Sequence, residues 1–310
     1  MKKKGVTVKG CQRWLCYKCR KSWSKPRGQY KAYHKTQLFK RWILGDTISS
    51  VATFAGISYS QTQRILMAKL EQEPSWSQKA LLSSKYVALD GKFLFGRKKT
   101  VLILFNTQTN LPIACKMVKS ENKKEITAFL IELREQGLCP IAVTTDGRGT
   151  IANCFKDIFP GIITQRCLFH IVLQINAWVR IPPRHPLGRQ LRGLIDTLMW
   201  IRTAEDIEVF WDRYNNIVAN SQDIIRELRG VAQENRQALD LLKCFPLLNN
   251  ARDDLFSYLV DSNIAPTTSG LEGFNKQIQK IKGFDHNGLT EEHIDLFIRH
   301  YVLTKGRPTK

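Results

Sequence analysis

The stretch from Ile141 to His170 constrains the fold more than any other part of the chain. An apolar, β-branched run ends abruptly at Asp146, and Gly147 permits a sharp turn directly behind it. A short helical segment, a second apolar run ending at Cys167 and the start of another helix follow. This pattern predicts a buried strand that delivers Asp146 to the carboxyl edge of an α/β sheet, where such sheets bind ligands. The alternative is a surface aspartate in an ordinary Asp-Gly turn.

The chain in front of this stretch has the periodicity of strands. Three apolar runs precede a helix that carries four apolar residues at helical spacing. The first run reaches a second carboxylate, Asp90, and continues past Gly91, where we expect a bulge. The order of elements predicts a mixed α/β sheet flanked by helices. We expect strands at 86–95, 100–105, 112–118, 141–146 and 162–167, and helices at 121–136, 150–157 and 168–179.

A long helical region separates this core from its last element. The proline-rich segment 181–186 ends the preceding helix, and residues 187–248 show only helical periodicity. The chain then returns through a loop to a helix that begins near Ser269. We therefore expect an α-helical insertion inside the α/β core. The face of the returning helix that should be buried carries Leu271, Phe274, Ile278 and Ile281.

Three carboxylates in this order fit metal-dependent phosphoryl transfer. Asp90 and Asp146 interrupt or end apolar strands, and they would face each other if those strands are neighbours. Glu272 lies in the first turn of the returning helix, and Asn275 follows on the same face. Two-metal phosphoryl transfer needs carboxylates that converge on ions about 3.5–4 Å apart, and Mg²⁺ or Mn²⁺ prefers such oxygen ligands. The alternative for Glu272 is a helix-capping box with Ser269.

These residues and their order resemble the ribonuclease-H-like catalytic core of Mutator-like bacterial insertion-sequence transposases. The resemblance covers about residues 85–282 and rests on an ordered set of motifs. It implies that Asp90, Asp146 and Glu272 form a metal-binding DDE triad. It also implies that water cleaves the element ends and that the freed 3′-hydroxyl joins target DNA. The motifs are Leu89-Asp90-Gly91, Thr145-Asp146-Gly147, Cys167-x-x-His170, the helical insertion, and Thr268-Ser269-x-x-Glu272-x-x-Asn275.

His170 and Cys167 each have a structural and a functional interpretation. The resemblance implies that His170 lies near the scissile phosphate and orients the phosphate or a water molecule. The alternative is a core histidine with satisfied hydrogen bonds. In its simplest interpretation, Cys167 is an ordinary buried cysteine. In the functional interpretation, it supports the site. As a zinc pair, the two residues would need two more ligands.

The N-terminal segment contains one Cys-x-x-Cys pair, Cys16 and Cys19. Thiolates at this spacing can share a tetrahedral Zn²⁺, but a structural site has four ligands and Cys11 is a poor third. The segment resembles the second half of the zinc ribbons at the front of many insertion-sequence transposases. We expect the first half to be encoded upstream of Met1. The alternative is a basic arm that binds no zinc.

Residues 36–70 show the pattern of three short helices, with Gly56 between the second and the third. Ser58 or Ser60 would cap the third helix. Two short helices around a glycine resemble a helix-turn-helix, in which polar side chains at the front of the second helix read bases in the major groove. The alternative is a small helical bundle without a role in DNA binding. The side chains expected to be exposed there are Gln61, Thr62, Gln63 and Arg64.

The charge of the chain indicates a polyanionic partner, of which nucleic acid is the commonest and an anionic membrane is the alternative. Lys and Arg total 48 against 27 acidic residues, a formal charge of +21 spread along the sequence. With the resemblance, we expect double-stranded DNA, both terminal inverted repeats and target, bound by a homo-oligomer. The sequence has no apolar run of about 18 residues, no signal peptide and no dense cysteine framework. We expect a cytoplasmic, nucleoid-associated bacterial protein that does not enter membranes.

The sequence therefore predicts a DNA transposase of an insertion sequence. The alternative is a catalytically inactive, transposase-derived regulator that only binds DNA. A third interpretation, a host ribonuclease or junction nuclease, does not explain the helix-turn-helix or the insertion. The expected segments are a partial zinc ribbon at 1–33, the helix-turn-helix at 34–75, the first part of the ribonuclease-H-like core at 80–180, the insertion at 181–258 and the rest of the core at 259–310.

Overall fold

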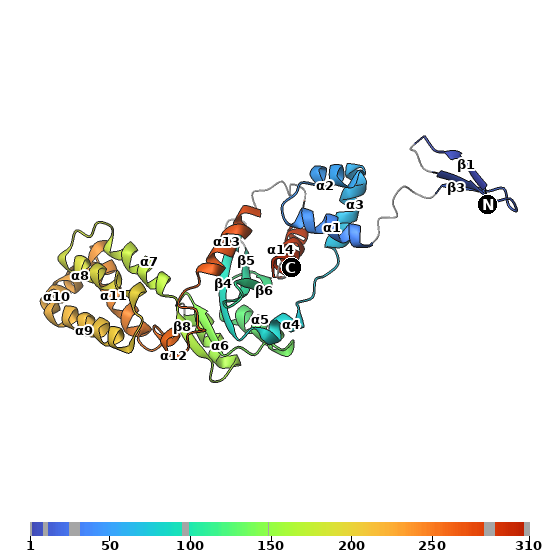
Figure 1. The fold of residues 1–310 in the computed structure, drawn as a ribbon. Coiled ribbons are helices and arrows are strands. Elements are labelled where there is room, and N and C mark those ends of the chain that lie inside the picture. Colours follow the sequence, from blue (N-terminus) through green and yellow to red (C-terminus); the bar gives the residue numbers. More distant parts are fainter. Residues whose placement is uncertain are drawn as a thin grey trace. The chain divides into compact units, whose positions relative to one another are not determined.

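The computed structural model describes residues 2–8, 12–24, 32–94, 99–147, 149–281 and 289–306. The chain divides into two compact units, Met1–Gln72 and Glu73–Lys310. Figure 1 shows the elements of both units. Within the described ranges, no helix is both long enough and apolar enough to span a bilayer.

The first unit contains a small antiparallel sheet and a group of helices. The sheet has the order β1-β2-β3, and the turn that joins β2 to β3 holds Cys16 and Cys19. The helices contact one another and bury apolar residues such as Trp42 and Leu66 between them. The elements are β1 (Lys2–Val6), β2 (Gln12–Leu15), β3 (Ser22–Ser24), α1 (Ala32–Ile43), α2 (Ile48–Ala55) and α3 (Tyr59–Leu70).

Capping interactions set the ends of α2 and α3. Gly56 adopts φ 65°, the left-handed conformation that glycine favours, and ends α2. The Ser58 hydroxyl accepts a hydrogen bond from the Gln61 N–H at 3.2 Å, so Ser58 rather than Ser60 caps α3. The expectation that Thr62 is exposed is wrong. Thr62 is fully buried because it shares one helix face with Leu66 and Leu70.

The second unit is built on a five-stranded mixed sheet with the order β6-β5-β4-β7-β8. β4 pairs antiparallel with β5, β5 antiparallel with β6, and β4, β7 and β8 are parallel neighbours. The bulge expected at Gly91 is absent, because the pairing of β4 with β5 runs without a shift. Gly91 instead allows a close approach, since a Cβ there would lie 2.6 Å from Glu121 Oε2. The strands are β4 (Tyr86–Leu94), β5 (Lys99–Asn106), β6 (Leu111–Val118), β7 (Ala142–Thr145) and β8 (Ile163–Arg166).

Helices cover both faces of this sheet. Leu89 of β4 packs in one buried cluster with Phe129 of α5 and Phe155 of α6. On the opposite face, Phe105 of β5 contacts Phe274 of α13 with a centroid distance of 6.3 Å, and α14 contacts β6. Alternate residues of each strand therefore face different helix pairs. These helices are α5 (Lys123–Glu135), α6 (Gly149–Ile158), α13 (Ser269–Ile281) and α14 (Glu291–Lys305), and α4 (Gln78–Ser83) precedes the sheet.

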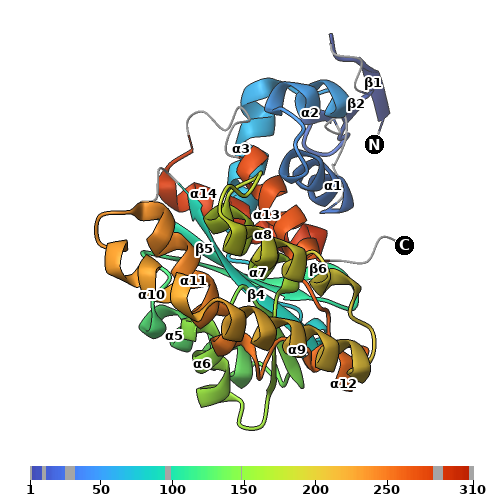
Figure 2. The same cartoon turned by 90° about the vertical axis from the view of Figure 1, so that its left-hand side faces the viewer.

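The insertion predicted at 181–258, all of which the structure describes, contains helices and turns but no strand, and together with α7, which precedes it, it forms a second buried cluster. Its helices gather beyond the β8 end of the sheet (Figure 1), and Figure 2 looks onto α8, α9 and α11. Thr203 and Asp206 form the capping box that starts α9, with both hydrogen bonds present. The elements are α7 (Leu168–Val179), α8 (Pro186–Ile195), the 3₁₀ turn η2 (Leu198–Trp200), α9 (Ala204–Asn220), α10 (Gln222–Val231), α11 (Arg236–Ala251) and α12 (Ser257–Val260).

The segment 254–268, which returns from the insertion, is hydrogen-bonded along the parallel strands. The Arg166 N–H donates to the Asp254 carbonyl at 2.6 Å, and the Thr144 hydroxyl donates to the Ala265 carbonyl at 2.8 Å. The segment thereby covers the outer edge of β8, which would otherwise leave unpaired backbone groups. It also fixes where α13 begins. Further bonds join Tyr86 to Asp261, Thr164 to Ser257, Gln165 to Leu255 and Tyr258, and Leu168 to Pro266.

We expect Asp254→Ala to lower the free energy of unfolding by about 3 kcal/mol, because it leaves the mostly buried Arg166 guanidinium without its carboxylate partner. The two side chains are 12% and 16% exposed and bond at 2.9 Å. Asp223→Ala is the matched control, because its pair with Arg226 is 80–87% exposed and should contribute less than about 1 kcal/mol. Urea unfolding of the two variants measures the difference. Equal losses would show that the return segment is not held by this pair.

Candidate active site

Asp90 and Asp146 occupy matching positions at neighbouring strands. β4 and β7 are parallel, and Ala88 of β4 pairs with Thr144 of β7. Asp90 lies two residues beyond Ala88, and Asp146 lies two residues beyond Thr144. Since side chains alternate along a strand and neighbouring strands lie about 4.8 Å apart, the two aspartates come to the same face of the sheet. That is the face covered by α13.

Gly147 shapes the turn directly after Asp146. It adopts φ +91°, and a Cβ there would lie 3.1 Å from Arg166 Cδ. An L-residue would therefore be strained both by the backbone and by the stem of Arg166. The same Arg166 is bound to Asp254 of the return segment, so one side chain connects the Asp146 turn with the insertion.

Asn275 connects α13 with Asp90. Its Nδ2 donates a hydrogen bond to Asp90 Oδ2 at 2.7 Å, and the residue is buried. The other amide atom, Asn275 Oδ1, is buried and has no hydrogen-bond partner among the described residues. An unpaired oxygen next to a carboxylate is a donor set of the kind that hard cations or bound water satisfy.

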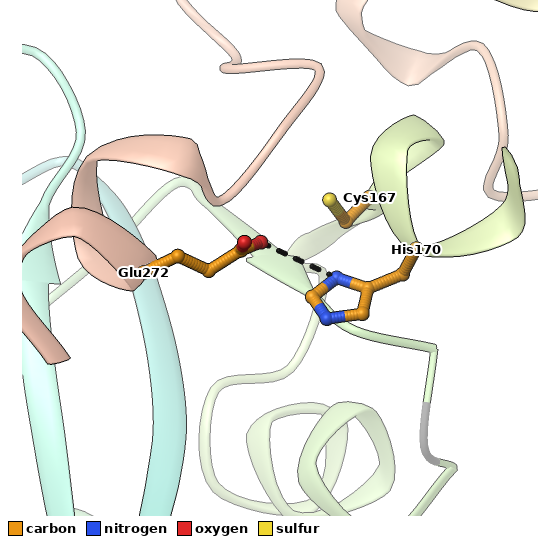
Figure 3. A group of neighbouring side chains, drawn as sticks. All are labelled: Cys167, His170 and Glu272. Atoms are coloured by element: carbon orange, nitrogen blue, oxygen red, sulfur yellow. Dashed lines mark ion pairs between the residues drawn. The ribbon is translucent and has the colours of Figure 1, made fainter. Parts of the chain in front are cut away.

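Glu272 is not part of a capping box. Ser269 is the first helical residue, and the first helical hydrogen bond runs from the Glu272 N–H to the Thr268 carbonyl at 2.9 Å. Ser269 is therefore not the N-cap that a Ser269–Glu272 capping box requires. The Thr268 backbone N–H donates to Cys167 Sγ at 3.3 Å. The Glu272 carboxylate instead lies 3.0 Å from the Thr268 hydroxyl, which can donate to it. The capping alternative is therefore wrong, and Glu272 Oε1 points toward α7 (Figure 3).

His170 and Cys167 meet Glu272 from the start of α7. His170 Nδ1 lies 3.7 Å from Glu272 Oε1, and donor atoms of the three residues all lie within 4.8 Å of one another. Across the described part of the chain, no other His, Cys, Asp or Glu side chains form a group of three at this distance. Glu272 is thus grouped with Cys167 and His170, and not with Asp90 and Asp146.

The electrostatics of this group favour a charged pair. The Cys167 sulfur, followed by the carboxylates of Glu272 and Asp146, raises the pKa of His170 to about 9 against the opposing effect of burial. Burial alone would raise the pKa of the Cys167 thiol, but the neighbouring His170 and the hydrogen bonds from Thr268 outweigh it and lower the pKa. His170 is therefore protonated at neutral pH and faces two acidic groups and a sulfur.

We expect the stabilisation provided by His170 to be lost at alkaline pH. Its pKa is raised from the ordinary 6.5 to about 9 in the folded chain, so its contribution is complete below 6.5 and disappears as the pH rises through about 9. His170→Gln should therefore be less stable than the parent chain at about pH 6 and nearly equal to it at about pH 10. Urea unfolding across this range measures the difference. A difference that is independent of pH would contradict the assignment.

The side chains predicted to read DNA lie on one exposed part of α3. Gln61, Gln63 and Arg64 are all exposed, whereas Thr62 between them is buried. The exposed residues therefore form a polar surface at the front of the helix. Their contact with bases stays a prediction.

Cys16 and Cys19 lie in the turn between β2 and β3, with the Cys16 N–H bonded to the Lys21 carbonyl at 3.0 Å. Hydrogen bonds from the Cys19 backbone and side chain lower the pKa of the Cys16 thiol. A lowered pKa favours the thiolate that binds metal. Cys11, the weak third candidate, lies outside the described residues. Zinc binding here stays a prediction.

Two features of the site were not predicted from sequence. Thr268 contacts both Cys167 and Glu272, although only its place in the motif was noted. Arg166 and Asp254 form the link to the insertion, and the signal that could have found them is an arginine at the end of a short buried strand. A charge at such a position needs a partner.

Comparison with known proteins identifies the family of the chain. No curated protein matches the chain. The model of the Mutator family of transposases matches residues 108–280, which is more than half of the chain. The match includes Asp146, His170, the helical insertion and Glu272. This chain therefore belongs to the Mutator family of transposases.

Proposed function

We propose that this chain is a DDE-type DNA transposase of an insertion sequence. It would cleave DNA strands at the ends of the element in a metal-dependent reaction and transfer the freed 3′-hydroxyl to target DNA. One observation carries this function: Asp90 and Asp146 come to the same face of the sheet from parallel strands, and α13 brings Glu272 and Asn275 to that face. The mixed sheet interrupted by a helical insertion supports a ribonuclease-H-like core.

Asp90, Asp146 and Glu272 would hold Mg²⁺ or Mn²⁺. The donor set fits these hard ions, since it offers carboxylate oxygens together with the unpaired Asn275 Oδ1. When bound, the ions would activate the attacking oxygen and stabilise the leaving one. Asn275 would keep Asp90 in position through its 2.7 Å hydrogen bond. To join the aspartates, the Glu272 carboxylate would turn away from His170.

His170 would act on the phosphate. With a pKa of about 9 it carries a positive charge at neutral pH, and its side chain is about one third exposed. A cation at this place would attract the scissile phosphate and hold it beside the carboxylates. Cys167 would support His170 from its buried position at the N-cap of α7.

The first unit would bind the element ends. α2 and α3 flank Gly56 as the helices of a helix-turn-helix do, and Gln61, Gln63 and Arg64 would contact bases. Cys16 and Cys19 would supply two thiolates to a zinc ribbon, provided that two further ligands come from elsewhere. The partners would be terminal inverted repeats and target DNA, bound by a homo-oligomer in the cytoplasm.

Cleavage of labelled double-stranded DNA from the element ends tests this function. The full chain should nick the ends with Mg²⁺ and join them covalently to target DNA, and chelation of the metal should stop both reactions. The inactive-regulator alternative predicts salt-sensitive binding of the same DNA without any cut. Binding without cleavage under either Mg²⁺ or Mn²⁺ would therefore overturn the enzymatic proposal.

A further inference from the structure

Cys167, His170 and Glu272 bring three different metal-binding groups to one place. A thiol sulfur, an imidazole nitrogen and a carboxylate oxygen lie within 4.8 Å of one another, from the start of α7 and the first turn of α13 (Figure 3). Sulfur and imidazole ligands select Zn²⁺ and related ions over Mg²⁺. Three protein ligands with an open fourth position are typical of catalytic zinc sites, whereas structural zinc sites have four protein ligands.

The spacing of the His170 and Glu272 donor atoms is close to that of two ligands in a zinc site. Zn–N and Zn–O bonds of about 2.0–2.2 Å and Zn–S bonds of about 2.3 Å place two tetrahedral ligands about 3.3–3.6 Å apart. The observed distance from His170 Nδ1 to Glu272 Oε1 is 3.7 Å, which is too long for a hydrogen bond. His170 Nδ1 is also buried and has no hydrogen-bond partner among the described residues. An ion between the two atoms would satisfy both.

Neighbouring donors orient the Cys167 sulfur, and the other two side chains are partly open to solvent. The Thr268 N–H and hydroxyl both lie 3.3 Å from Cys167 Sγ, so the sulfur is oriented from the α13 side. Ligating side chains are usually positioned by such neighbouring donors. Cys167 is fully buried, but the side chains of His170 and Glu272 are 33% and 22% exposed. An ion would therefore reach the group from the exposed side.

We propose that Cys167 Sγ, His170 Nδ1 and Glu272 Oε1 bind a soft divalent ion such as Zn²⁺, and that this ion withholds Glu272 from the Mg²⁺ site and inhibits cleavage. The inhibition rests on the proposed role of Glu272 in cleavage, whereas the binding of the ion does not. A soft ion would thereby act as a reversible inhibitor that chelation removes.

Co²⁺ is a suitable probe, because thiolate ligation gives Co²⁺ a charge-transfer absorption and Zn²⁺ displaces Co²⁺ from such sites. The full chain would carry Cys11→Ser, Cys16→Ser and Cys19→Ser, which removes the N-terminal thiols. We expect one equivalent of Co²⁺ to give the thiolate band and Zn²⁺ to abolish it. Cys167→Ser and His170→Gln should remove or strongly weaken the band. Cys139→Ser, at an exposed cysteine, is the matched control and should leave it unchanged.

Cys167→Ser should fold, because serine is a preferred N-cap residue and Cys167 is the N-cap of α7. Absence of the Co²⁺ band in the parent, or its persistence in folded Cys167→Ser, would overturn the site. Zn²⁺ should also inhibit Mg²⁺-dependent cleavage at least tenfold less in Cys167→Ser than in the parent, and equal inhibition would overturn the competition. A Co²⁺ band in a chain that never cuts DNA would instead uphold the site and reject the proposed function.

Discussion

Asp90→Asn and Asp146→Asn are each expected to abolish metal-dependent cleavage, with a loss on the order of a thousandfold or more. Asparagine keeps the size of the side chain and its hydrogen-bonding capacity but removes the charge that holds a divalent ion. If Asp146 served only an Asp-Gly turn, asparagine would replace it with little effect, since both residues suit turns. Strand cleavage under Mg²⁺, together with DNA binding and circular dichroism, separates these outcomes.

Asp157→Asn is the matched control for these variants. Asp157 lies on α6 and pairs with Lys123 at 2.9 Å, where both side chains are more than half exposed. Its substitution should leave cleavage unchanged. The double variant of Asp90 and Asp146 should be no slower than either single variant, because groups that act as one unit are not additive. Cleavage at the parental rate by either single variant would reject that aspartate as a ligand.

Replacing Gln61, Gln63 and Arg64 with alanine is expected to remove the preference for element ends while non-specific binding persists. Each lost base contact should cost about 1–3 kcal/mol of discrimination, or roughly 5- to 150-fold in relative affinity. Non-specific binding rests on the charge of +21 and should fall by about 0.9 log units per neutralised phosphate for each tenfold rise in salt. Competition between end DNA and unrelated DNA at fixed salt measures the preference.

Gln37→Ala provides the control for this prediction, since Gln37 is an exposed glutamine on α1 of the same unit. This substitution should reduce the affinity for end DNA and for unrelated DNA only slightly and by the same factor. If the triple variant on α3 kept the full preference for element ends, the alternative of a small helical bundle without a DNA role would be favoured.

Features that depend on a few neighbouring residues were predictable from the sequence. Helical and strand periodicity located the five strands of the mixed sheet and the helical insertion within a few residues of their observed ends. Capping residues located helix starts, as with Ser58 at α3. The placement of Asp146 directly after a buried strand was also a local signal, an apolar run followed by Asp-Gly.

Features that depend on distant residues were not predictable in this way. Thr268 and Cys167 are 101 residues apart, and Arg166 and Asp254 are 88 apart, so no local pattern links them. The prediction of a bulge at Gly91 was wrong for a similar reason. The glycine makes room for the side chain of Glu121, which is distant in sequence, and does not interrupt the pairing of the strand. The capping-box alternative for Glu272 is wrong because α13 already begins at Ser269, so Ser269 is not the N-cap of this helix.

The candidate active site combines features that neighbouring residues determine with features that distant residues determine. Residue types and order predicted which side chains matter, and the register of β4 and β7 agrees with the predicted approach of Asp90 and Asp146. The partners of Glu272 could not be read from spacing alone, since they depend on where α7 meets α13. Cys167 and His170, which lacked further zinc ligands in the sequence, gain Glu272 as a third donor only in the folded chain.

Cleavage by Glu272→Gln tests the central claim most directly. The Thr268 hydroxyl can donate to the amide oxygen of glutamine as it can to Glu272 Oε1 at 3.0 Å, so the local structure should survive. The loss of one negative charge, however, should prevent productive binding of Mg²⁺. We predict a folded variant that binds end DNA and does not cut it. Mg²⁺-dependent cleavage at the parental rate would contradict the DDE assignment of Asp90, Asp146 and Glu272.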